Sequence, residues 1–446
     1  MFNREILKNL NAWKNRSGRR PLILRGARQV GKTTVINMFS KEFDVFVELN
    51  LDLYSDIQVF KEEYGIDEII QAVQVYKNIS FGKGSVLIFI DEIQNSPQAV
   101  KMLRYFYEKH PDIFVIGAGS LLEIALEKED ISFPVGRVEF LYLYPFSFSE
   151  FLEASEEKIL LEILLSGKTP DYAHDRLLKL FHTYTLIGGM PAIIKNYLEN
   201  KEVTGLKTIY ESLLISFVND SEKYARNQTM RSVIGHCLNT IPQETGKRIK
   251  FQNFGKSDYR SREVGEAIRL LEKAMLIFLV YPATNTSVPS IIDYKRSPKL
   301  QFFDTGMINY FTKIQPEYFK YDDLCDIYRG LIAEHVVRQE ITASDLTTND
   351  PVPMWTRESK SSNAEVDILI QVKGQIIPVE VKSGSSGSLK SLRLFMDESK
   401  NDFAVRLCQN MINVETVKTP SGKKFKLLNI PYYLAGQLQN IISKYL

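Results

Sequence analysis

The sequence has little cysteine, little histidine and almost no excess of charge of either sign. Its 446 residues include three cysteines, Cys237, Cys325 and Cys408, and five histidines. Cysteines this far apart form neither a metal knuckle nor a disulfide framework, which suggests a reducing compartment. With so few histidines as well, a zinc site is not expected.

Long hydrophobic runs are missing too. The longest, residues 274–280, is far shorter than the roughly 20 apolar residues of a membrane-spanning helix. The N-terminus carries Arg4, Glu5 and Lys8, so the apolar segment of a signal peptide is not expected. We therefore predict a cytoplasmic protein with no membrane partner. The net charge of +2 neither favours nor excludes nucleic acid, so any basic surface has to be local.

What the sequence does contain is a phosphate-binding loop. Residues 21–34 read PLILRGARQVGKTT, an apolar strand, then the pattern GxxxxGK[ST], then the start of a helix. Glycines let such a loop turn its N–H groups toward phosphates, and the positive end of the helix faces the same anions. Lys32 is predicted to reach the β- and γ-phosphates, and Thr33 to bind Mg²⁺. The predicted nucleotide contacts are Gly26, Ala27, Arg28, Gln29, Val30, Gly31, Lys32, Thr33 and Thr34.

A second motif supplies the acids that such a loop requires. Residues 85–92 are a continuous apolar run ending in Asp91 and Glu92, which is typical of a strand covered on both faces of a parallel sheet. Ligands bind at the carboxyl end of such strands. We predict that Asp91 holds Mg²⁺ and that Glu92 orients and deprotonates the attacking water. The GTPase pattern NKxD is absent, so ATP is favoured over GTP.

Two further residues are candidates on weaker signals. Residues 113–120 form a strand that ends in Ser120, which could touch the γ-phosphate or the attacking water, although many strands end in glycine and serine without any function. Arg137 stands just ahead of another strand and could project toward the nucleotide of a neighbouring subunit. That role would imply a homo-oligomer, but a surface arginine is commonplace.

Several motifs together resemble a known family. LRGARQVGKTT, LIFIDEIQNSP, VIGAGSLL, GRVEFLYLYPFSFSEF and LIGGMPAIIKNYL, in this order, look like prokaryotic AAA-type ATPases that carry a C-terminal domain of unknown function. The resemblance covers nearly the full chain and is strongest over the first half. It implies that residues 113–120 are a sensor strand inserted between the two motif strands. It also implies that helices from residue 150 to about 224 form a lid, with Pro191 packing on adenine.

From residue 230 the pattern favours a winged helix-turn-helix. Helices are expected at residues 230–241 and 262–275, followed by wing strands at residues 276–281 and 300–303. Clustered lysine and arginine on such a unit are the usual footprint of DNA binding, although winged helices also bind proteins. These basic residues are Lys247, Arg248, Lys250, Lys256, Arg260, Arg262, Lys295, Arg296 and Lys299.

The last segment has its own pattern of acids and lysine. A helix is expected at residues 330–337, and strands at residues 354–357, 365–370 and 376–382. Asp367 precedes Glu380 and Lys382, which point to one face of their strand. This is the D…ExK arrangement of restriction-endonuclease-like nucleases.

In that arrangement, Asp367, Glu380 and Glu334 on the preceding helix are the predicted Mg²⁺ ligands. Lys382 would position or activate water and stabilise the charge that develops on a phosphate. His335, beside Glu334, is expected on the helix surface rather than as a ligand. The fold is often kept after its chemistry is lost, so cleavage of DNA does not follow from the fold alone.

The sequence therefore predicts an α/β protein of four domains. These are a P-loop ATPase core with a parallel sheet at residues 1–150, a helical lid at 151–225, a winged helix-turn-helix at 226–320 and a restriction-endonuclease-like domain at 321–446. The favoured function is an ATP-hydrolysing AAA-type protein that requires ATP and Mg²⁺ and acts on DNA. The alternative is a nucleotide-dependent switch or scaffold that recruits a protein partner, with an inactive nuclease-like domain. A small-molecule kinase is less favoured, because it has no evident use for the two later domains.

Overall fold

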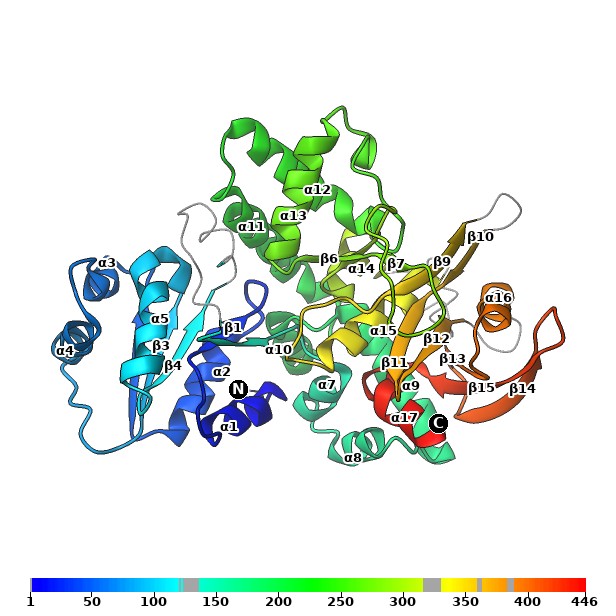
Figure 1. Cartoon of the computed structure of the whole chain (residues 1–446), viewed down its shortest axis with the longest axis horizontal. Coiled ribbons are helices and arrows are strands. Elements are labelled where there is room, and N and C mark those ends of the chain that lie inside the picture. Colours follow the sequence, from blue (N-terminus) through cyan, green and yellow to red (C-terminus); the bar gives the residue numbers. More distant parts are fainter. Residues whose placement is uncertain (1, 120–121, 123–135, 316–329, 359–362, 383–388) are drawn as a thin grey trace.

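The N-terminal part of the chain is built on a five-stranded parallel sheet, at the left of Figure 1. The computed structural model describes residues 2–119, 122, 136–315, 330–358, 363–382 and 389–446. The strand order is β2-β3-β4-β1-β5, so β4 lies between the two motif strands, as predicted. The strands are β1 (Leu22–Arg25), β2 (Val45–Asn50), β3 (Val86–Asp91), β4 (Phe114–Ala118) and β5 (Glu139–Tyr142).

Helices cover both faces of this sheet because its strands are apolar on both faces. Along β1, Leu22 and Leu24 pack in the same core as α1 and α2, whereas Ile23 packs in the core with α4 and α5. This alternation puts one helix pair on each face. The helices are α1 (Ile6–Lys14), α2 (Lys32–Phe39), α3 (Tyr54–Ile57), α4 (Ile66–Lys77) and α5 (Pro97–Lys109).

A helical region follows the sheet and lies in the middle of the molecule (Figure 1). It begins with α7, where the Ser147 side chain caps the helix and the Glu150 carboxylate accepts a hydrogen bond from the backbone N–H of Ser147. This capping box is the signal that starts the helix. The helices are α7 (Phe148–Ala154), α8 (Lys158–Ser166), α9 (Asp171–Ile187), α10 (Pro191–Asn200) and α11 (Lys207–Glu222).

The next region pairs helices with a two-stranded antiparallel sheet, β6 with β8. The segment after β6 continues into the short strand β7, which pairs in parallel with β9 of the C-terminal region. The two regions therefore share a sheet. The elements are α12 (Gln228–Glu244), α13 (Ser261–Lys273), β6 (Ile277–Val280), β7 (Pro282–Ala283), β8 (Lys299–Phe302) and α14 (Thr305–Phe311).

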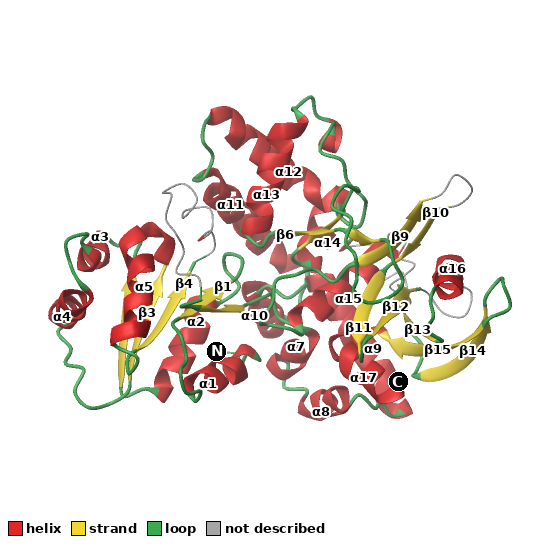
Figure 2. Cartoon of the chain, in the orientation of Figure 1, coloured by secondary structure: helices red, strands yellow, loops and turns green. Residues whose placement is uncertain are grey.

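The C-terminal region is a mixed sheet with helices around it (Figure 2). Its strand order is β11-β12-β13-β15-β14, and a smaller sheet has the order β10-β9-β7. The single strand predicted at residues 365–370 is instead interrupted at Asp367, and its two halves lie in different sheets. The elements are α15 (Leu331–Ala343), β9 (Met354–Glu358), β10 (Asn363–Val366), β11 (Ile368–Val372), β12 (Gln375–Val381), α16 (Lys390–Glu398), β13 (Phe403–Cys408), β14 (Asn413–Lys418), β15 (Lys424–Pro431) and α17 (Leu438–Tyr445). Among the described helices, none has both the length and the apolar character needed to span a membrane.

Helix α15 joins the C-terminal region to the rest of the chain through buried polar side chains. His335 was predicted on its surface, and that prediction is wrong. The imidazole is 3% exposed and lies 2.8 Å from both the Thr305 hydroxyl and the Phe302 carbonyl oxygen. Burial lowers the pKa of His335 to about 4, so the ring is neutral.

On the same helix, Glu340 faces the helical region. Its carboxylate accepts hydrogen bonds from the backbone N–H of Phe148 at 3.0 and 3.1 Å and from the Tyr184 hydroxyl at 2.7 Å. Burial raises the pKa of Glu340 to about 8, and the nearby Glu5 and Glu150 act in the same direction. This carboxyl group therefore links α15 to α7 and α9.

We expect Glu340 to make stability depend on pH. Its pKa is about 8 in the folded protein, against an ordinary value of 4.5. Between these two pH values the folded state therefore holds a proton that the unfolded chain has lost. The stabilisation is complete below pH about 4.5 and is lost as pH rises to about 8. The free energy of unfolding should fall across this range, and fall less steeply in Glu340→Gln. Urea unfolding at several pH values measures this. Equal slopes for Glu340→Gln and for the exposed control Glu63→Gln would contradict it.

Candidate functional site

The phosphate-binding loop connects β1 to α2 and curls tightly. Gly31 has φ 99° and is the N-cap of α2, a left-handed conformation that glycine adopts without strain. At Gly26 the constraint is space, because a Cβ there would lie 2.4 Å from the Leu143 carbonyl oxygen. Glycine is therefore required at the two positions for different reasons: backbone conformation at Gly31 and lack of space at Gly26.

Lys32 is buried in this loop. Its ammonium donates to the carbonyl oxygens of Gly26 and Ala27, at 2.9 and 3.0 Å. Burial lowers the pKa of Lys32, while Glu92 and Asp91 oppose that shift. The ammonium is therefore held against the loop backbone, with the acids of β3 close enough to act on it.

The two sequence motifs meet at the carboxyl edge of the sheet. The Thr33 hydroxyl donates to the Asp91 carboxylate at 2.7 Å. A hydroxyl and a carboxylate this close are hard oxygen donors of the kind that Mg²⁺ prefers. The loop and β3 therefore form one site.

Glu92 follows Asp91 and turns away from the strand. Its backbone is left-handed, with φ 50°, and its carboxylate accepts a hydrogen bond from the Gln94 side-chain amide. Burial raises the pKa of Glu92, while Gln94 and Lys32 lower it. A left-handed backbone at a non-glycine residue costs energy and is common at functional sites.

A second cluster lies in the C-terminal region, where Asp367 sits between β10 and β11. The Asp367 carboxylate accepts from the Val381 backbone N–H at 2.8 Å, and Lys382 lies 3.2 Å from Glu380. Within the described part of the chain, the second oxygen of Glu380, Oε2, is buried and has no hydrogen-bond partner. The structure thus brings the D…ExK residues together.

Burial and neighbouring charges shift the pKa values of the groups in this cluster. Burial raises the pKa of Asp367 to about 6, and Glu334 adds to the rise. Burial, then Asp367, raises the pKa of Glu380 well above its ordinary value. Burial alone would lower the pKa of Lys382, but Glu380 and Asp367 outweigh it and raise that pKa. Two buried acids and one partly exposed lysine therefore interact strongly.

Glu334 is held by cations instead of standing free. Lys299 donates to both of its oxygens, at 2.8 and 3.0 Å, and Arg338 donates at 3.0 Å. Lys299 also lies 2.6 Å from Glu365. In the described ranges, no three His, Cys, Asp or Glu side chains gather closely enough to hold a metal ion. The carboxylate of Glu334, the predicted third ligand, is paired with Lys299 and Arg338.

The same pairing corrects the predicted basic surface. Lys299 is 5% exposed, and its ammonium faces the C-terminal acids rather than solvent. Arg248 lies 2.6 Å from Glu358, and Arg296 contacts Asp293 and Glu358 at 3.2 and 3.7 Å. The sequence showed the charges but not their partners, most of which (Glu334, Glu358 and Glu365) come from a later segment of the chain. The basic residues that remain exposed are Lys247, Lys250, Lys256, Arg260, Arg262 and Lys295.

Comparison with protein families agrees with the geometry of the nucleotide site. Residues 18–152 match the model of an AAA domain. This part of the chain is an AAA domain. Residues 178–318 and 329–433 match two domains of unknown function, DUF8612 and DUF4143. No curated protein matches the chain.

Several solved structures are similar to the chain. A Walker-type ATPase of Pyrococcus abyssi is 16% identical, with 70% of this chain and 96% of that one covered and a TM-score of 0.44. For RuvB of Thermotoga maritima the identity is 15%, the coverage 66% and 93%, and the TM-score 0.27. For the ORC1 protein of Aeropyrum pernix in complex with DNA the identity is 13%, the coverage 70% and 93%, and the TM-score 0.24.

The other predicted residues of the AAA domain have different outcomes. Ser120 lies outside the described residues. Arg137 lies at the amino end of β5, the edge opposite the phosphate-binding loop, and pairs with Glu108 at 3.0 Å. It is therefore not part of this subunit's own nucleotide site. Pro191, the first residue of α10, has its ring 3.9 Å from where a Cβ on Gly31 would lie, so it borders the loop.

The sequence did not reveal a structural role for Arg4, which is 4% exposed and is hydrogen-bonded to the phosphate-binding loop. Its guanidinium donates to Val30 O at 3.0 Å, to Tyr144 O at 2.7 Å and to Glu150 at 2.9 Å. The only signal was a basic residue ahead of an amphipathic helix. Because the partners of Arg4 come from distant segments, these contacts can be recognised only in the folded structure.

Helix α11 also reaches the loop, which the sequence did not reveal. Arg28 forms an ion pair with Asp220, and the Gln29 amide donates to the Ser216 hydroxyl at 3.0 Å. Two predicted nucleotide contacts thus direct their side chains to the helical region and leave their backbone N–H groups for phosphates. A movement of α11 would therefore displace or break these two contacts with the loop.

We expect the buried Lys299 to be important for stability. Replacing it with methionine leaves Glu334 and Glu365 without their shared cation, and removal of one partner from a buried ion cluster costs about 3–5 kcal/mol. Lys299→Met should therefore lower the melting temperature by about 5–15 °C, as measured by differential scanning calorimetry. The matched control is Lys295→Met, an exposed lysine in the segment just before β8. Equal melting temperatures for the two variants would contradict a stabilising role for the cluster.

Proposed function

We propose that this protein hydrolyses ATP, acts on DNA, and carries a metal-dependent nuclease site in its C-terminal domain. The observation that carries the ATP part is the 2.7 Å hydrogen bond between Thr33 and Asp91. It places the loop, the helix end and the acids of β3 around one position. The nuclease part is supported by the meeting of Asp367, Glu380 and Lys382.

In the ATP site, each residue has a role that its geometry supports. The loop N–H groups and Lys32 bind the phosphates, with Lys32 exchanging its bonds to Gly26 and Ala27 for phosphate oxygens. Thr33 and Asp91 would hold Mg²⁺, which neutralises phosphate charge when bound. Glu92 accepts the proton of the attacking water, and its burial favours this because it raises the pKa toward neutrality. The position of Pro191 beside Gly31 supports its proposed contact with adenine.

DNA binding is supported by exposed basic side chains around α13. Lys250, Lys256 and Arg260 lie between α12 and α13, Arg262 lies in the first turn of α13, and all four are exposed. Cations on such a segment bind phosphates of the DNA backbone and do not by themselves read sequence.

In the C-terminal domain, Asp367 and Glu380 would hold the divalent cation. The buried, unpartnered Oε2 of Glu380 supports this, because such an oxygen is costly unless a cation or donor occupies its site. The cation would polarise the scissile phosphate when bound. Lys382 would orient the attacking water and stabilise negative charge on the phosphate oxygens.

One observation favours a second function, a nucleotide-dependent switch with an inactive nuclease-like domain. Glu334 and one oxygen of Glu380 are already paired with Lys299, Arg338 and Lys382. Acids that are paired from within the chain need no metal ion to neutralise them. In this reading α11 and Arg28 would transmit the state of the nucleotide to a protein partner.

Glu92→Gln tests the assignment of the base. We expect ATP turnover to fall about 10²–10⁴-fold, because general base catalysis contributes that much, while ATP affinity stays the same. Phosphate release measures turnover, and a fluorescent ATP analogue measures affinity. The control is Glu63→Gln, an exposed acid away from the loop. Unchanged turnover in Glu92→Gln would show that another group is the base.

Incubation with DNA separates the two proposed functions. With Mg²⁺ or Mn²⁺, the wild type should nick linear, circular or branched DNA. Asp367→Asn and Lys382→Met should lose that activity, because they remove a metal ligand and the charge that stabilises the phosphate. Exposed controls in the same domain are Asp402→Asn and Lys400→Met. Absence of nicking that depends on Asp367 and Lys382 would remove the nuclease part and leave the switch.

A further inference from the structure

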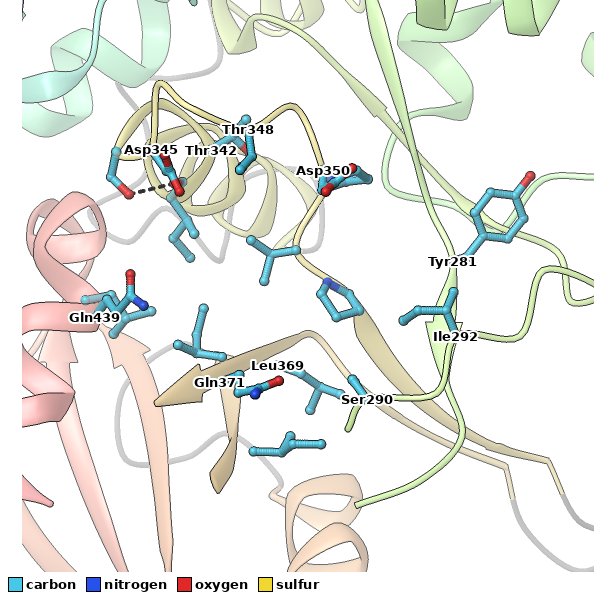
Figure 3. A pocket seen from close by; sticks show the side chains of 18 of the residues that line it. Tyr281, Ser290, Ile292, Thr342, Asp345, Thr348, Asp350, Leu369, Gln371 and Gln439 are labelled. Atoms are coloured by element: carbon cyan, nitrogen blue, oxygen red, sulfur yellow. Dashed lines mark hydrogen bonds between the residues drawn. The ribbon is translucent and has the colours of Figure 1, made fainter. Parts of the chain in front are cut away.

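A cavity of about 700 Å³ lies between the C-terminal domain and the region of α12, α13 and β6–β8 (Figure 3). Figure 3 shows its walls coming from separate elements: Gln371 from β11, Gln439 from α17, and Ser290 and Ile292 from the segment between β7 and β8. Asp350 lies on the loop after α15. Small-molecule sites typically have volumes of about 300–1,000 Å³ and lie between domains. The size and place of the cavity are those of a ligand site.

The charges in this cavity all have the same sign. Its lining includes Glu272, Asp345 and Asp350, and among the described lining residues there is no lysine or arginine. These carboxylates would repel a phosphate or a nucleic acid. The cavity is therefore not an extension of the proposed DNA surface.

Much of the rest of the lining is apolar or aromatic. Leu279, Ile292, Leu369 and Ile376 form apolar walls, and Tyr281 and Tyr294 lie with ring centroids 5.0 Å apart. Tyrosine faces attract cations, which adds to the effect of the acids.

One polar group in the wall has no partner. The Ser290 hydroxyl is buried and, within the described residues, makes no hydrogen bond. A buried hydroxyl without a partner costs free energy that a bound donor or acceptor would recover. Glu272 is partly satisfied, since one of its oxygens accepts from the Leu279 N–H at 3.1 Å.

We infer that this cavity binds a small organic cation, an amine or guanidinium carried on an apolar body. The carboxylates of Glu272 and Asp350 receive the charge, the leucine and isoleucine walls receive the body, and Ser290 supplies a hydrogen bond. A separate crevice next to the cavity shares Glu272 and Asp350 and contains Arg25 and Lys273. Glu272 and Asp350 thus lie between the cavity and the crevice, and the described lining of the cavity contains no lysine or arginine.

Such a ligand would contact both the C-terminal domain and the α13 region. It would therefore stabilise one arrangement of the two, and its binding does not depend on ATP hydrolysis or on the nuclease site. Neither function tested above is needed for this site, so its failure and theirs are distinguishable.

The test uses 2-phenylethylamine, which is charged at neutral pH, and 2-phenylethanol, which has the same body without the charge. Isothermal titration calorimetry on the full chain should show one site that binds the amine at least about tenfold more tightly than the alcohol. Glu272→Gln combined with Asp350→Asn should remove that preference. Ile292→Trp, which fills the chamber, should weaken both ligands. The matched control is Glu202→Gln, an exposed acid outside the cavity.

Three results would overturn the inference. One is equal affinity for the amine and the alcohol, which would show that the acids do not select charge. The second is amine binding that survives both the Glu272→Gln, Asp350→Asn double variant and Ile292→Trp. The third is no binding of the amine at a concentration on the order of 10 mM. Circular dichroism of each variant establishes that it is folded.

Discussion

A hydrogen bond of 2.7 Å between the Thr33 hydroxyl and the Asp91 carboxylate joins two residues that are 58 positions apart. It forms because β1 and β3 are parallel strands separated only by β4, so their carboxyl ends meet at one edge of the sheet. Two oxygens at this separation can contact one divalent cation. The proposed binding of ATP and Mg²⁺, the role of Lys32 and that of Glu92 all depend on this one placement.

The nucleotide loop is also connected to the opposite end of the chain through buried polar groups. Arg4 donates to Val30 in the loop and to Glu150, which caps α7. The next N–H of that helix start, on Phe148, donates to Glu340 of α15. Removing one partner of a buried ion pair such as Arg4–Glu150 is strongly destabilising, and the buried Glu340 adds its hydrogen bond, so these contacts hold the regions in a defined relation. A change in the loop has to be accommodated along this connection or has to break it.

The C-terminal acids show how a cluster can serve two different purposes. Glu334 is paired with Lys299 and Arg338, and this part of the cluster stabilises the contact between two regions. Asp367 and Glu380 are less satisfied, and burial raises the pKa of both. The two functions proposed for this domain, nuclease and scaffold, differ in what would occupy the site beside the unpartnered Glu380 oxygen. A divalent cation there would support chemistry, whereas Lys382 alone would support only structure.

The sequence by itself determined the local elements and the chemistry of the motifs. Strand–loop–helix at residues 21–39, the acids at the end of β3 and the D…ExK residues were predictable, because apolar periodicity and glycine pattern act over a few neighbouring residues. Tertiary structure alone decided that His335 is buried, that Lys299 faces acids instead of solvent, that a strand breaks at Asp367, and that Arg4 is hydrogen-bonded to the loop. Each of these depends on partners from distant segments. Burial and the electrostatic field at a side chain are properties of the packed chain, and no short stretch of sequence contains them.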